Sequence, residues 1–381
     1  MLVGGKLSWR LVLKYTGRPV AIHVLLAMGV ALAYQEFELS FLAVPAMPVT
    51  VLAATIGILL TFRNNSAYDR WWEARTLWGA LVNTSRTFAR QVITFLPLPG
   101  SPEEAKASSL PGSSLLRAAG EGEPAVTLGA SDGAVRDRFG AARGAFIGRA
   151  SEPATAHGAP VKHAGDVVDD PHKPFHAPWE GITADARELV YAQIGFVNAL
   201  RHHLRRQDPF PSLEPFFRPA VLAALREEQN VPTAIVVWAS ARLRRIFAET
   251  PGTEAMLRLT LLDGSLTELM NILGACERIK NTPLPRQYDV LPRAMVRAYL
   301  MLLPFGVVAE LGMLTPVVTA IIAFLFIAMD AVGRDVEAPF EDGYSDTPMT
   351  ALCRTIEINL RQMLGEKELP PPLQPKDGLL Y

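Results

Sequence analysis

The sequence predicts an all-α membrane protein with four transmembrane helices per subunit and a helical cytosolic domain. Three observations predict this class. The mean hydropathy is positive, at +0.18, and only 20% of the 381 residues are charged; four apolar stretches are long enough to cross a bilayer; and lysine and arginine gather on one side of those stretches. The net charge of -1 gives no indication of a nucleic-acid partner.

The four candidate spans cover about residues 19–35, 39–62, 291–309 and 311–329. A helix of about 20 residues crosses a hydrocarbon core of roughly 30 Å. The second span, which starts near residue 39 or 44, carries Pro, Thr and Gly that a helix facing only lipid does not need. These small and polar residues favour a helix packed against other protein.

The positions of the basic residues orient the spans. They precede the first span (Lys6, Arg10, Lys14, Arg18), follow the second (Arg63, Arg70, Arg75), enter the third (Arg286, Arg293, Arg297) and follow the fourth (Arg334). The short connections 36–43 and 304–314 contain neither Lys nor Arg. By the positive-inside rule, both termini and the long middle segment are cytoplasmic.

Two alternatives to this arrangement are open. The spans could be core helices of a soluble protein, although the one-sided basic residues argue against it. The first span could instead be a signal peptide, because basic residues and an apolar stretch lead to Ala31-Leu32-Ala33. Its removal would leave three spans and place the basic segments on the wrong side.

Residues 97–178 are rich in Gly, Ala, Ser, Pro and His and have almost no apolar periodicity. Such a segment cannot bury enough apolar surface to offset its chain entropy, so we expect a flexible cytosolic insertion with at most a short helix near 134–147. Its acidic and histidine residues could form a metal site, but a solvated polar run is the favoured interpretation: Asp166, Asp169, Asp170, His172 and His176.

Helical periodicity resumes after Trp179. We expect helices at 184–205, 216–228, 232–249 and 253–279, and a C-terminal helix that begins at Thr347-Pro348 with a capping hydroxyl and ends near Leu364. Four residues form an apolar stripe on this last helix: Leu352, Ile356, Leu360 and Met363. We expect this stripe to dock either on the parent protein or on a neighbouring subunit.

A basic cluster ends the first of these helices: Arg201, His202, His203, Arg205 and Arg206. It is either a solvated helix terminus, the commoner case, or a site for nucleic acid or anionic lipid. The two cysteines, Cys276 and Cys353, are far apart and have no ligand-like spacing, so we expect ordinary reduced thiols.

Ala54, Ile58 and Phe62 recur at i, i+4 and i+8 and therefore share one face of the second span. Arranged around an axis by several subunits, such a face makes stacked apolar rings that can gate by dewetting. The alternative to a pore-lining face is a stripe that packs against another helix of the same protein.

Several motifs resemble those of the bestrophin family of ion channels, in its bacterial branch. FRNNSAYDRWWEARTLWGALVN contains Arg63, Asn64, Asn65, Arg70, Trp71 and Trp72. ACERIKNTPLP, which enters the third span, contains Glu277, Arg278, Pro283 and Pro285. The resemblance covers about residues 7–95 and 179–361.

The resemblance implies a homopentamer around one central pore. It implies a hydrophobic neck at Ala54, Ile58 and Phe62, in which the small Ala54 would make the outermost ring wide, and a cytosolic aperture near Thr260 or Leu261. Calcium-gated animal members carry an acidic cluster after the fourth span. Here the acids are scattered, at Glu337, Glu341, Asp342 and Asp346. A calcium site needs six to eight converging oxygens, so we expect no calcium site and no other cofactor.

The spans and the change in composition divide the chain into five expected parts: 1–96 with two membrane helices and the neck, 97–178 as the insertion, 179–290 as the cytosolic helical domain, 291–331 with the last two membrane helices, and 332–381 as a cytosolic tail. No catalytic motif is present in the sequence, so we expect no enzyme. We expect Asp69 and Glu73 to pair with Arg70 or Arg75, and Trp71, Trp72 and Trp78 to be interfacial or packing aromatics.

The expected function is passage of small monovalent ions, chloride or other anions by preference, across the bacterial inner membrane. The partners are then the bilayer, the permeant ions and further copies of the chain. Two alternatives stay open: a cation-selective pore of the same architecture, and a membrane scaffold through which no ion moves.

Overall fold

The computed structural model describes residues 9–96, 182–248 and 252–375. The predicted insertion 97–178, with its short helix and its acidic and histidine residues, lies outside these ranges. In the described residues the secondary structure is helical, without a strand. The helices are α1 (Trp9–Glu36), α2 (Ala46–Phe95), α4 (Ala184–Arg205), α5 (Phe210–Leu213), α6 (Pro219–Arg226), α7 (Val231–Ala248), α8 (Thr253–Asn281), α9 (Arg286–Leu311), α10 (Thr315–Glu337) and α11 (Met349–Met363), with short 3-10 turns η1 (Ser40–Leu42) and η3 (Gly312–Leu314).

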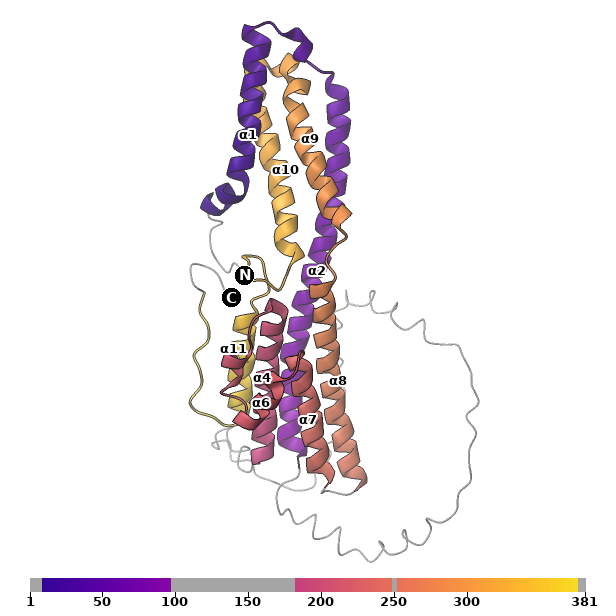
Figure 1. Ribbon diagram of the computed structural model, residues 1–381, viewed down its shortest axis with the longest axis vertical. Helices are drawn as coiled ribbons and strands as arrows, with labels where there is room; N and C mark the ends of the chain where they lie inside the picture. Colours follow the sequence, from indigo (N-terminus) through magenta and orange to yellow (C-terminus); the bar gives the residue numbers. More distant parts are fainter. Residues whose placement is uncertain (1–8, 97–181, 249–251, 376–381) are drawn as a thin grey trace, which may run out of the picture. The chain divides into compact units, whose positions relative to one another are not determined.

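Three continuous stretches are long and apolar enough to cross a membrane: Tyr15–Glu36, Ser40–Phe95 and Arg286–Glu337. The third stretch contains both α9 and α10, which η3 separates. Figure 1 shows that α9 and α10 run in opposite directions and are joined at η3, as α1 and α2 are joined at η1. Gly312 permits the tight link after α9 because its φ is +50°, a conformation that side chains disfavour.

The first of two hydrophobic cores joins α2 to α9 and α10. It contains Val49, Ile56 and Leu60 of α2, Leu300 and Leu303 of α9, and Ala323 of α10, among others. We call α1, residues 46–62 of α2, α9 and α10 the apolar bundle. α9 approaches α2 closely at Gly306, where a Cβ would lie 2.7 Å from Val49 Cγ2, so a larger residue there would separate the two helices.

The second core lies around residues 74–95 of α2 and its C-cap Leu96, and its other walls are α4, α7, α8 and α11. We call these elements the polar bundle. Trp78, Leu81 and Phe88 of α2 are buried against it, together with Leu200 of α4 and Leu269 of α8. Since α2 is one unbroken helix of 50 residues, it belongs to both bundles.

The C-terminal helix docks on its own chain, which resolves one open alternative. α11 packs on α2 and α4, and Ile356 and Leu360 are completely buried there. The prediction that the hydroxyl of Thr347 caps this helix was wrong. The N-cap of α11 is Pro348, and Thr347 Oγ1 is buried without a hydrogen-bond partner among the described residues. The expected helix at 216–228 is present as the shorter α6, and the short helix α5 that precedes it was not expected. The chain turns after α5 and restarts at α6, with Pro219 in its first turn.

Candidate functional site

One face of α2 is left uncovered along the apolar bundle. Ile58 and Phe62 are 59% and 62% exposed, and Ala54 is also exposed. Met47 and Val51 continue the face toward the start of the helix. The described part of the chain therefore does not use the three predicted neck residues as a packing stripe within one subunit.

The threonines near this face do not make it polar. The hydroxyls of Thr50, Thr55 and Thr61 donate hydrogen bonds to backbone carbonyls four residues earlier, at 3.1, 3.0 and 2.8 Å. A hydroxyl bonded to its own helix leaves its methyl group free to face outward. The face from Met47 to Phe62 is thus apolar and offers little to hold water.

Directly after this face, Arg63 turns inward and is completely buried. Its Nη1 donates to Asp330 Oδ1 of α10 at 2.6 Å, and its Nη2 donates to Asp289 Oδ1 of α9 at 3.0 Å. Asp289 also accepts from Arg293, and Asp330 lies 3.1 Å from Arg334. One guanidinium on α2 therefore joins the helices on either side of it. We call Arg63, Asp289 and Asp330 the arginine clamp.

Other residues of the predicted motif fix α2 to backbone carbonyls. Asn64 donates to Met329 O at 3.1 Å, and Trp71 Nε1 donates to Ser345 O at 2.6 Å. Arg70 donates to Glu337 O at 2.8 Å and also to Ile279 O and Thr282 O. Since α10 packs on Asn64 at Gly333, a side chain there would displace the amide.

The motif therefore has two sides. Arg63, Asn64, Arg70 and Trp71 hold the subunit together, whereas Asn65 and Trp72 are exposed on the outward side. Trp72 is 56% exposed, in contrast with the completely buried Trp78, which is a packing residue of the polar bundle. The structural ion pair expected for Glu73 is present, but its partner is Arg278 of α8 rather than Arg70 or Arg75.

Thr260 and Leu261, the predicted aperture residues, are exposed on α8. They lie beside the last turns of α2, as two contacts show: Ser265 Oγ donates to Gln91 Oε1 at 2.7 Å and Arg258 Nη1 to Phe95 O at 3.4 Å. Gln91 follows Phe62 by 29 residues, about 44 Å along a helix. The structure thus does not bring the neck and aperture candidates together.

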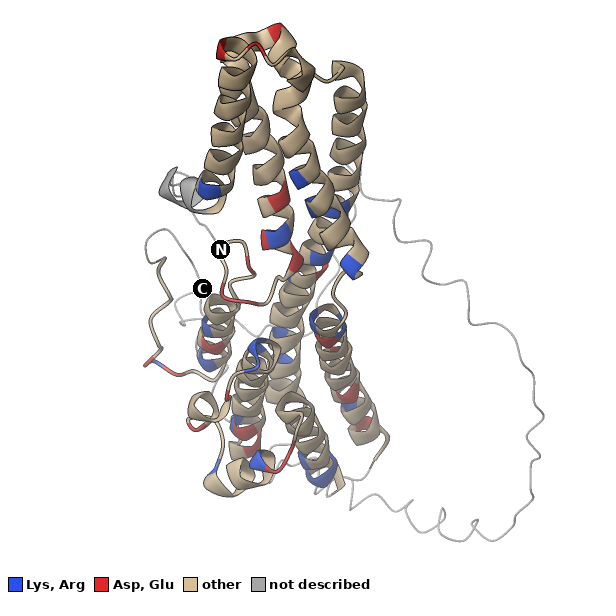
Figure 2. Ribbon diagram, turned by 45° about the horizontal axis from the view of Figure 1, so that its top comes forward, with Lys and Arg blue, Asp and Glu red and all other residues tan. Residues whose placement is uncertain are grey.

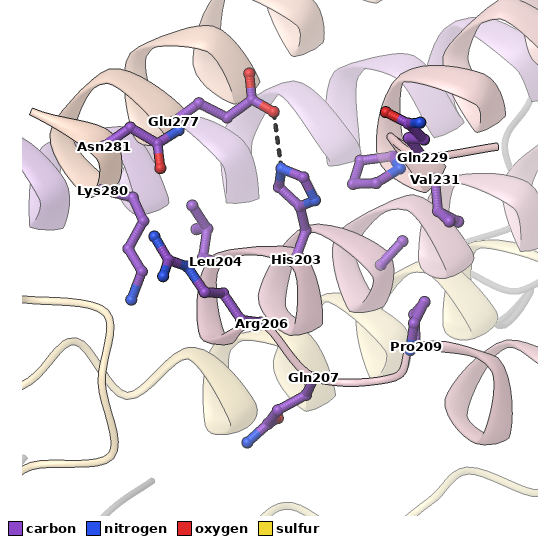
Figure 3. A pocket seen from close by; sticks show the side chains of 12 residues that line it. His203, Leu204, Arg206, Gln207, Pro209, Gln229, Val231, Glu277, Lys280 and Asn281 are labelled. Atoms are coloured by element: carbon purple, nitrogen blue, oxygen red, sulfur yellow. Dashed lines mark hydrogen bonds and ion pairs between the residues drawn. The ribbon is translucent and has the colours of Figure 1, made fainter.

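The second motif organises the junction of α4, α7 and α8 (Figure 3). Glu277 Oε1 accepts from His203 of α4 and from Asn230, each at 2.8 Å, and Asn230 Oδ1 accepts from Thr233 N at the start of α7. His203 and Glu277 line a pocket of about 280 Å³. At the end of the motif Pro283 lines a second cleft and Pro285 is the N-cap of α9.

The acids after α10 have separate partners. Glu341 pairs with Lys280, and Asp342 lies 2.6 Å from Arg205. Asp346 is buried and accepts from Gly343 N at 2.7 Å. These three carboxylates are directed at different partners rather than at one point, and the expectation of no calcium site stays a prediction.

Burial raises the pKa of both thiols to about 12. Cys276 and Cys353 are free and buried. A thiol with such a pKa holds almost no thiolate at neutral pH and is a poor nucleophile. This agrees with the expectation of ordinary reduced cysteines.

Three comparisons with known proteins agree with one another. A family described as bacterial/fungal bestrophin protein matches residues 10–117 and 175–362. The voltage-dependent anion channel-forming protein RSc3414 of Ralstonia nicotianae is 27% identical over 322 residues, which is 84% of this chain and 78% of that protein. The protein YneE of Escherichia coli K12, with the same description, is 25% identical over 86% of this chain and 80% of its own length.

Solved structures share the fold. A bacterial bestrophin homologue from Klebsiella pneumoniae superposes with a TM-score of 0.65 at 23% identity, over 92% of this chain and 98% of that one. A variant of the Klebsiella homologue gives the same TM-score over 91% of this chain. The family match covers most of the sequence, and it includes the motif that carries Arg63 of the arginine clamp and the α2 residues that bind backbone carbonyls. The chain therefore belongs to the bestrophin family.

Proposed function

We propose that this chain is one subunit of an anion channel in the bacterial inner membrane, with α2 lining the pore. The observation that carries the proposal is the uncovered apolar face of α2 at Ala54, Ile58 and Phe62. The relatives named as anion channel-forming proteins support it. Family membership and these relatives indicate a channel rather than an enzyme.

The proposed topology has four spans: α1, the first part of α2, α9 and α10. Figure 2 shows acidic residues at the outer end of the apolar bundle and basic residues where its helices end on the other side. Glu36, Glu38 and Glu310 are at the acidic end, and Arg63, Arg293 and Arg334 are at the basic end. By the positive-inside rule, the basic end faces the cytoplasm, with both termini and the polar bundle.

The proposed assembly is a homopentamer. A single subunit has no central pore, so the uncovered face of α2 becomes a pore wall only when several copies place it around an axis. Closed rings are the common symmetry of such assemblies. The bilayer and the permeant ions are then the only other partners that the proposal needs, and no cofactor is required.

The proposed gate is the ring of Phe62 side chains, together with the ring of Ile58 one helical turn closer to the start of α2. Rings of apolar side chains expel water when the pore is narrow, and an ion cannot cross without its hydration shell. Ala54 gives a wider ring. The aperture candidates Thr260 and Leu261 would form a second constriction beside the last turns of α2.

The first test is the reversal potential of the purified protein in planar bilayers under a KCl gradient. We expect reversal close to the chloride equilibrium potential. Reversal close to the potassium potential would replace the anion channel with a cation channel of the same architecture. No current from verified oligomers would favour the scaffold.

The same bilayers test the gate. Phe62→Ala and Ile58→Ala widen the rings, so we expect higher conductance or open probability. Ile321→Ala is the matched control, because Ile321 on α10 is 57% exposed and Ile58 is 59% exposed, but Ile321 lies outside the α2 face. Currents of the two neck variants equal to those of the control would remove these residues from the gate.

A further inference from the structure

A second cleft, of about 420 Å³, lies where α8 ends, α9 begins and α10 ends. Five basic and three acidic side chains line it, so its wall has an excess of positive charge. Figure 2 shows basic residues gathered at this level of the chain. The basic side chains are Arg70, Arg206, Lys280, Arg293 and Arg334.

Two of the three acids are already neutralised. Asp289 accepts from Arg63 and, through both carboxylate oxygens, from Arg293 at 2.6 and 2.7 Å. Glu341 pairs with Lys280. The backbone carbonyl of the third acid, Glu337, accepts from Arg70, and its carboxylate is a counter-charge for the same guanidinium. The acids therefore leave basic groups in the wall without a counter-charge.

Arg206 is the clearest of these groups. Its guanidinium has no ion pair or hydrogen bond with any described residue, in contrast with the other four basic groups, which are bonded. Arg206 caps α4 in the left-handed conformation, with φ at +55°. Glycine is the residue that suits this position, and a side chain there costs roughly 1 kcal/mol. The fold thus keeps an unpaired guanidinium at the wall, beside Lys280 (Figure 3).

The cleft adjoins exposed apolar side chains. Val290 and Leu291 in the first turns of α9 are 59% and 54% exposed, and Val332 near the end of α10 is 61% exposed. Arg70, which lines the cleft, points away from the α2 face that carries Phe62, since it follows the inward positions of Arg63 and Ala67. The cleft is therefore on the side of α2 opposite the proposed pore wall.

We propose that this cleft binds the phosphate group of an anionic ligand, and that its favoured source is the headgroup of a lipid in the cytoplasmic leaflet. Basic pockets at the cytoplasmic ends of membrane helices suit such headgroups, with acyl chains on the adjacent apolar surface. The size of the cleft suits one headgroup rather than a nucleic-acid strand. The inference rests on the membrane topology given under the proposed function.

The test is native mass spectrometry of the full chain in detergent, which measures bound lipid without measuring current. The probes are phosphatidylglycerol, phosphatidylcholine with the same acyl chains, and inorganic phosphate. We expect phosphatidylglycerol to be retained in excess over phosphatidylcholine. We expect Arg206→Gln to weaken this retention at least roughly tenfold, as the loss of one charge-assisted contact predicts.

Two variants control the result. Arg245→Gln removes an exposed charge near the end of α7 and should keep the preference for phosphatidylglycerol. Arg206→Lys keeps the charge and should restore most of the binding, which separates the site from a folding defect. A third outcome is that inorganic phosphate stabilises the wild-type protein against unfolding, that Arg206→Gln loses this effect, and that no lipid is retained. This would support the phosphate site and assign it to a soluble anion.

An equal retention of both lipids with no effect of inorganic phosphate would overturn the proposal, as would an Arg206→Gln variant that binds like the wild type. Current in bilayers of phosphatidylcholine alone tests the channel separately. A protein that conducts there but fails the lipid test would keep the proposed function and lose this site.

Discussion

Asp346 illustrates how the loop after α10 uses its acids. Its side chain is buried, and its carboxylate accepts one hydrogen bond from Gly343 N. Burial raises the pKa of Asp346 to about 6, because desolvation of the carboxylate outweighs that hydrogen bond. The folded protein therefore binds this proton more tightly than the unfolded chain does.

The expected result is a loss of stability as pH rises from about 4 to 6, with no further change from this group above that range. Asp346→Asn should remove this part of the pH dependence and raise the free energy of unfolding at pH 8, on the order of 1–3 kcal/mol. Thermal unfolding in detergent at pH 5 and pH 8 measures both. A wild type and variant with parallel pH profiles would show that Asp346 titrates normally.

Sequence reasoning located several residues without showing what they do. Arg63 and Arg70 stood out as motif residues, but their partners are more than 200 positions away in the chain. No local periodicity can pair residues at that separation. Arg206 appeared only as part of a basic cluster, and its lack of a partner emerged from the positions of Asp342 and Glu277, which pair with its neighbours Arg205 and His203.

At the scale of the elements, the arginine clamp determines how α2 meets α9 and α10. Asp330 is almost completely buried, and removal of the guanidinium would leave its charge with only the partly exposed Arg334. Breaking a buried pair in this way is more costly than losing an exposed one.

We expect Arg63→Gln to lower the free energy of unfolding by about 3 kcal/mol. Arg75→Gln is the control on the same helix, because Arg75 makes no ion pair with a described residue, and it should change stability by less than about 0.5 kcal/mol. Denaturation in detergent, followed by circular dichroism, compares the two. If both variants unfold alike, the clamp does not stabilise the fold.

The helices themselves were largely predictable, because their apolar periodicity is local. α7 and α8 lie within two residues of the expected ranges. The failures occurred at short-range details that depend on tertiary packing. α6 begins at Pro219 rather than at 216, and Thr347 lies in a buried position where its hydroxyl does not cap α11.

At the scale of the whole molecule, exposed apolar side chains on the polar bundle bear on the proposed assembly. Met256 and Leu257 of α8 are 66% and 60% exposed, although the proposed topology places them outside the bilayer. They share one face of α8 with the aperture candidates Thr260 and Leu261, so copies arranged around the proposed axis would meet at this apolar face.

If the proposed homopentamer forms, we expect Leu257→Asp to shift it to smaller species, because a charge in an apolar interface is desolvated without a partner. Ala224→Asp, on the exposed side of α6, introduces the same charge elsewhere and should leave the assembly intact. Native mass spectrometry gives the stoichiometry of each. Pentamers in both variants would move the interface away from this part of α8.

The unbroken length of α2 has a mechanical consequence. The clamp at Arg63 is about 25 Å from the start of the helix at Ala46 and about 48 Å from its end at Phe95, at 1.5 Å per residue. If α2 pivots at that point as a stiff rod, it is a lever with unequal arms. A tilt that moves Phe95 sideways moves the outer end in the opposite direction by about half as much, so a displacement of the polar bundle arrives at Ala54 reversed and reduced.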